Sequence, residues 1–72
     1  MHELPWQERV VEEKSELDVR IERLQEFLRG DQFKGLMSDE QLRLERQAVL
    51  MSEYSSILRQ RIQNFRVRRF DG

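Results

Sequence analysis

The chain contains no cysteine, so disulfide bonds cannot stabilise it. Its only histidine is His2, which argues against a structural zinc site, and nothing else in the composition points to a cofactor. A monomer of 72 residues buries only about 60% of the surface that its unfolded chain exposes. Chains of this size without such staples often gain stability by assembling, so we expect a homo-oligomer.

Long apolar runs are also missing, and none approaches the roughly 18 residues that cross a bilayer. The N-terminal stretch MHELPWQER lacks the apolar segment of a secretory signal. We therefore expect a cytoplasmic protein that does not associate with membranes.

The chain has no excess of charge of one sign. Charged residues make up 38% of it, yet 13 basic and 14 acidic side chains leave a formal net charge of −1. This balance argues against nucleic acid as the main partner and against a disordered chain. With only three glycines and one proline, the composition favours an all-α fold.

Catalytic groups are scarce. There is no cysteine nucleophile, no interior histidine base and no glycine-rich phosphate loop. Acid pairs such as Glu12 and Glu16 lie four residues apart, which is typical of the solvated face of a helix. We therefore predict that the protein is not an enzyme and has no catalytic or metal-binding residues.

The spacing of apolar residues predicts a first helix over about 5–29. Pro5 suits the first helical turn, and Gly30 suits a left-handed residue just after the helix end. A loop is expected at 30–37, with Phe33 and Leu36 folded inward. The apolar positions of the first helix follow the spacing of a coiled-coil seam: Val10, Leu17, Ile21, Leu24 and Leu28.

A second helix is predicted over about 38–65. Ser38 and Gln41 have the spacing of a capping box, and Met37 and Leu42 that of a hydrophobic staple. Its seam consists of Leu44, Ala48, Met51, Leu58, Ile62 and Phe65, flanked by Leu50, Tyr54 and Ile57.

Two helices of similar length joined by a short loop predict an antiparallel hairpin over 1–65. Trp6 is then expected to pack on Phe65. The apolar stripe is wider than one helix pair needs, so we predict a four-helix bundle or a higher assembly. The predicted oligomer interface comprises Val10, Leu17, Ile21, Leu24, Leu28, Leu44, Met51, Tyr54, Leu58, Ile62 and Phe65.

Two seam positions are polar. Lys14 and Ser55 each occupy a site where an apolar residue is expected. Lys14 either snorkels or pairs with a glutamate across the interface, which would set the oligomer register, or it faces a ligand in a pocket between hairpins. Tyr54 is either a half-buried core residue with a wet hydroxyl or a stacking platform for a base.

The basic C-terminal tail, 66–72, follows the hairpin. Antiparallel pairing brings arginines such as Arg59 and Arg61 toward Glu8, Glu12, Glu13 and Glu16, where ion pairs would disfavour a parallel register. The tail could instead bind a phosphate, a base or a protein groove. The candidate ligand or partner contacts are Lys14, Tyr54, Arg61, Arg66, Arg68, Arg69 and Phe70.

The segments EEKSELDVRIERLQEFL (12–28) and LRLERQAVLMSEYSSILRQRI (42–62) resemble a family of very small phage and prophage proteins named for a crAss-like phage member. The resemblance covers most of 9–65 and transfers no catalytic or binding residue. It implies a phage origin and a bacterial host cytoplasm. The matching positions are Glu13, Lys14, Glu16, Leu17, Ile21, Leu24, Phe27, Gln47, Met51, Tyr54, Leu58, Arg61 and Ile62.

Three hypotheses for function follow. The first is an oligomeric hairpin that acts by protein–protein interaction, as an inhibitor of a host defence protein. The second is an oligomeric sponge that sequesters cyclic nucleotide immune signals. The third is weak nucleic-acid binding by the arginine-rich tail, with a steep salt dependence.

Overall fold

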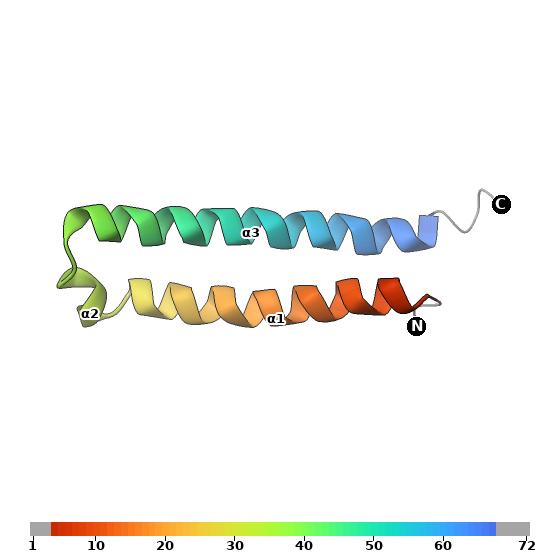
Figure 1. Cartoon of the computed structure of the whole chain (residues 1–72), viewed down its shortest axis with the longest axis horizontal. Coiled ribbons are helices and arrows are strands. Elements are labelled where there is room, and N and C mark those ends of the chain that lie inside the picture. The colour runs from red at the N-terminus through yellow and green to blue at the C-terminus, as the bar shows by residue number, and fades with distance from the viewer. Residues whose placement is uncertain (1–3, 68–72) are drawn as a thin grey trace.

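The structure, a computed structural model, describes residues 4–67, with the backbone alone for 66 and 67. Three helices make up this part: α1 (Pro5–Leu28), α2 (Asp31–Lys34) and α3 (Ser38–Val67). Figure 1 shows α1 and α3 side by side and antiparallel, with α2 at the end where they are joined. The molecule measures 55 × 16 × 15 Å, so it is one helix pair thick. The predicted all-α fold is confirmed, and the predicted four-helix assembly stays a prediction.

The core lies between α1 and α3 and uses the predicted seams. Leu58 is fully buried and packs in one cluster with Val10, Leu17 and Phe65. Ile21, Met51 and Ile62 pack against the edge of this core. The residues that form the buried cluster are Val10, Leu17, Leu58 and Phe65. Four residues of the predicted oligomer interface, those of the buried cluster, therefore form the core of one hairpin.

Both polar seam positions are joined by Asp18. The Lys14 ammonium lies 2.6 Å from Oδ2 of Asp18, one turn further along α1. The Ser55 hydroxyl of α3 donates a hydrogen bond of 2.6 Å to Oδ1 of the same carboxylate. The hydrogen bonds from Lys14 and then Ser55 lower the pKa of Asp18 below its ordinary value of 3.8. The predicted pairing of Lys14 with a glutamate across an interface is not what the structure shows, because its acid partner is Asp18 on the same helix.

The end of α1 differs from the prediction. Gly30 has φ −93° and ψ 174°, an extended conformation, so the predicted left-handed cap is wrong. The Arg29 and Gly30 N–H groups instead donate to the Glu26 and Phe27 carbonyls, which tightens the last turn. Gly30 then precedes α2, a four-residue helix within the predicted loop. Phe33 of α2 packs edge-on against Phe27, with ring centroids 6.4 Å apart.

The predicted capping box does not form at the start of α3. Ser38 is already helical, and the Gln41 side-chain amide donates to the Phe33 carbonyl at 2.8 Å. Gln41 thus ties α3 to α2. The predicted staple also contributes little burial, because Met37 and Leu42 remain 77% and 61% exposed.

Candidate functional site

α3 carries a second apolar face that is largely exposed to solvent. We call it the outer face and define it by Leu42, Val49, Leu50 and Ile57, whose exposed fractions are 61%, 56%, 62% and 53%. With about 3.6 residues per turn, these positions lie on the side of α3 roughly opposite its buried positions, such as Ala48 and Leu58. A helix that is apolar on two sides has more apolar surface than one hairpin can cover.

A groove of about 420 Å³ follows one edge of the outer face. Its surface is mainly apolar, although four of the six residues that line it have polar side chains. We call it the Arg–Tyr groove. Its lining residues are Arg43, Arg46, Gln47, Leu50, Met51 and Tyr54. A volume of this size is in the range of small-molecule sites.

A second groove of about 270 Å³ lies beside the first. It is lined by Leu42, Glu45, Arg46, Val49 and Leu50. Arg46 and Leu50 line both grooves, so they form the ridge between them. The outer face therefore has a ridge with a hollow on either side.

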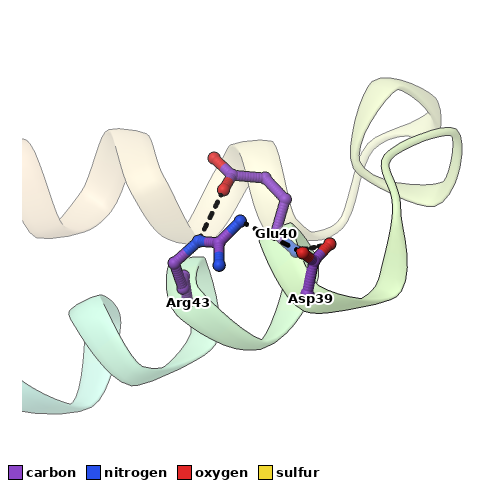
Figure 2. A network of polar contacts seen from close by, with 3 residues as sticks. All are labelled: Asp39, Glu40 and Arg43. Atoms are coloured by element: carbon purple, nitrogen blue, oxygen red, sulfur yellow. Dashed lines mark hydrogen bonds and ion pairs between the residues drawn. The ribbon is translucent and has the colours of Figure 1, made fainter.

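Arg43, at one end of the Arg–Tyr groove, is held by two acids of the first turn of α3. Its Nε lies 3.0 Å from Oε1 of Glu40, and its Nη2 lies 3.5 Å from Oδ2 of Asp39. Figure 2 shows the guanidinium group between the two carboxylates. The Arg43 side chain is 63% exposed, so these pairs are weak and leave the guanidinium group within reach of solvent.

Tyr54, at the other end of the groove, is 42% exposed. Its hydroxyl donates a hydrogen bond to Oε2 of Glu13 on α1. That bond to a carboxylate is the main reason why the pKa of Tyr54 is raised above 10.0, and the charge of Arg61 opposes it. The phenol is thus neutral at ordinary pH and anchored to α1.

The structure places the ligand residues that were predicted from the sequence in different environments. Tyr54 lines the groove, Lys14 is engaged with Asp18, and Arg61 is exposed near Tyr54. The Arg66 side chain lies outside the described residues. So do Arg68, Arg69 and Phe70.

Two arginines of the groove, Arg43 and Arg46, were not predicted. Gln47 entered the sequence analysis only through the resemblance. The signal that could have found the groove is the series Arg43, Gln47, Leu50 and Tyr54, in which each residue follows the one before by three or four positions.

Of the ion pairs predicted at the open end of the hairpin, those of Arg59 and Arg61 are not formed, and those of the tail arginines lie outside the described residues. No acid of the first half of α1 lies within ion-pair distance of Arg59 or Arg61, as far as the described side chains go. Aromatic packing joins this end instead. Trp6 meets Phe65 edge-on with ring centroids 5.1 Å apart, as predicted.

Within residues 4–67, no group of three or more histidine, cysteine or acidic side chains is placed to hold a metal ion. None of the helices in that range is long and apolar enough to span a membrane.

The family model described as Sequestin matches residues 4–64. The chain belongs to the Sequestin family. The matched range holds α1, α2 and most of α3, so the outer face and the Arg–Tyr groove both lie within the Sequestin region. Comparisons with curated proteins and with solved structures give no match. The resemblance to phage proteins stays a prediction alongside this assignment.

Proposed function

We propose that this Sequestin binds and sequesters a cyclic nucleotide without transforming it. The observation that carries the proposal is the Arg–Tyr groove, a mainly apolar hollow whose lining residues include two arginines and a tyrosine. The name Sequestin agrees with a sequestering role. The groove supplies binding groups and no nucleophile paired with a base.

The phosphates of the ligand are bound by Arg43 and Arg46. Guanidinium groups hold phosphate oxygens through paired, charge-assisted hydrogen bonds. Arg43 must leave Asp39 and Glu40 to do so, and exposed pairs of that kind contribute only about 0–1 kcal/mol. A phosphate that engages both arginines offsets this cost.

The base of the ligand rests on Tyr54 and the apolar floor of Leu50 and Met51. Stacking a base on an aromatic side chain contributes about 1–3 kcal/mol. The Gln47 amide can both donate and accept, so it can bond to the edge of a base. The hydrogen bond from Tyr54 to Glu13 holds the ring in place before the ligand arrives.

Isothermal titration calorimetry against a panel of cyclic mono-, di- and trinucleotides tests the proposal. At least one member should bind, and Arg43→Ala and Tyr54→Ala should each weaken that binding tenfold or more, which corresponds to about 1.4 kcal/mol. Arg59→Ala is the matched control, because Arg59 lies on α3 outside the groove and should leave the affinity unchanged. The proposal is contradicted if none of the nucleotides gives heat on binding. It is also contradicted if Arg43→Ala, Tyr54→Ala and Arg59→Ala all bind with the same affinity.

A second candidate is the predicted protein–protein role, in which the chain blocks a host defence protein. The exposed outer face favours it, because large apolar patches often mark protein contacts. We rank it second since it explains neither the arginines of the groove nor the family name. This candidate predicts that the chain forms a complex with a host protein and that the complex remains intact during gel filtration. The Leu50→Glu variant should not form this complex.

A further inference from the structure

We propose that the outer face of α3 joins two copies of this chain, which pack antiparallel about a two-fold axis between Val49 and Leu50. This contact needs no ligand, although it shares Arg46 and Leu50 with the Arg–Tyr groove, so it is tested on the ligand-free protein. It also differs from the predicted interface, whose buried residues lie within a single hairpin.

A second copy is expected because one hairpin buries few of its apolar side chains. Its buried apolar side chains are Val10, Leu17, Ala48, Leu58 and Phe65. The molecule is only 15 to 16 Å across, so no third layer covers α3. The four large side chains of the outer face stay more than half exposed in one copy.

The positions of the residues along the outer face are symmetric about one point. The residue numbers 42 and 57, 46 and 53, and 49 and 50 share one midpoint. A two-fold axis at that midpoint places Leu42 against Ile57 of the second copy, and Val49 against Leu50 of the second copy. Both contacts occur twice, as an isologous interface requires.

The charges on this face select the antiparallel direction. In that register Arg46 faces Glu53 of the second copy, and the same pair recurs on the other side of the axis. Among the described side chains, neither Arg46 nor Glu53 takes part in an ion pair within the hairpin. A parallel register would set Arg46 against Arg46 and Glu53 against Glu53, which is repulsive.

The resulting assembly is a layer of four helices in the order α1, α3, α3, α1. The outer face lies roughly opposite the hairpin core, so the second copy extends the layer sideways. In a compact four-helix bundle, by contrast, all four helices would surround one core. Helices that pack in this way lie about 8–10 Å apart. The second copy's α3 also lies beside the Arg–Tyr groove and adds a wall to it.

Single-cysteine variants test the register, because the natural chain has no cysteine to interfere. Arg46→Cys mixed with Glu53→Cys should form a disulfide-linked mixed dimer under mild oxidation. Arg46→Cys alone should not cross-link, because seven residues separate positions 46 and 53, or about 10 Å along the helix. Arg20→Cys, exposed on α1, is the control. Cross-linking of Arg46→Cys to itself, or none in the mixture, overturns the proposal.

Charge reversal provides an independent measurement. Sedimentation equilibrium of the ligand-free protein should show a dimer. Arg46→Glu should raise the dissociation constant at least tenfold, and the double variant Arg46→Glu with Glu53→Arg should restore it. Arg59→Glu should have no effect, and circular dichroism checks that every variant keeps its helices. A wild-type monomer at about 100 µM overturns the proposal, as does a dimer indifferent to Arg46→Glu.

Discussion

Ser55 of α3 donates a hydrogen bond of 2.6 Å to Asp18 of α1, and Lys14 holds the other oxygen of that carboxylate. Asp18 thereby fills the gap that Lys14 and Ser55 leave in the two apolar seams. Two helices with only apolar contacts could slide past each other. A polar bridge at one height favours a single register.

The bridge makes the stability of the hairpin depend on pH. Because the pKa of Asp18 is lower in the folded state, its contribution is present above the unfolded value of about 3.9 and is lost as pH falls through the folded value. The Asp18 side chain is 46% exposed, so we expect less than about 1 kcal/mol. Asp18→Asn should lower the free energy of unfolding at pH 7 and reduce its fall between about pH 5 and pH 2.

A double-mutant cycle with Ser55→Ala isolates the contact between helices. The two substitutions together should cost less than the sum of each alone, because both remove the same hydrogen bond. Asp31→Asn is the control, since Asp31 is fully exposed and lies in α2. Strict additivity would show that the bridge does not couple α1 to α3.

Leu58→Ala tests where the core lies. Leu58 is fully buried, and truncating such a leucine costs about 2–5 kcal/mol. A hairpin this small should then be largely unfolded at room temperature, as measured by circular dichroism during thermal melting. Val19→Ala removes a side chain that is 45% exposed on α1 and should change the melting temperature little. Equal effects of the two substitutions would contradict the described packing.

Tyr54 is the only tyrosine, so its ionisation can be followed by ultraviolet absorbance. The Glu13 carboxylate raises its pKa, and Glu13→Gln should bring the titration midpoint down toward 10.0. The hydrogen bond stabilises the fold below pH 10 and is lost as pH rises through the raised value. Glu12→Gln, on the neighbouring residue, should leave the midpoint in place. An unchanged midpoint in Glu13→Gln would rule out the contact.

Trp6 is the only tryptophan and reports on the open end of the hairpin. It is 38% exposed and packs on the buried Phe65 ring. Phe65→Ala should shift its fluorescence to longer wavelength, because water reaches the indole. Phe27→Ala, which breaks the other ring pair near α2, should leave the emission wavelength unchanged. A shift in the control with none in Phe65→Ala would place Trp6 elsewhere.

The sequence predicted what regular spacing determines. The seams through Leu17 and Leu58 and the packing of Trp6 on Phe65 all follow from helical periodicity and antiparallel order. The turn was less predictable. Gly30 can adopt many conformations, and whether α2 forms depends on where Phe33 and Gln41 find partners.

The candidate site was harder to infer from the sequence. Arg43 and Arg46 resemble any solvated arginine of a charged helix. Their significance comes from the groove beside Leu50 and Tyr54, which requires knowing which side of the helix faces α1. An apolar residue such as Leu50 looks like part of a wide core stripe until the structure shows that it is 62% exposed.

Equilibrium dialysis with recovery of the ligand tests the sequestration account most directly. A cyclic nucleotide that binds in calorimetry is dialysed against the protein, and the protein is then denatured by heat to release what it holds. We predict depletion of the free nucleotide in fixed proportion to protein, followed by recovery of the same nucleotide chemically unchanged. Recovery of a cleaved product, or no depletion at all, would contradict the account.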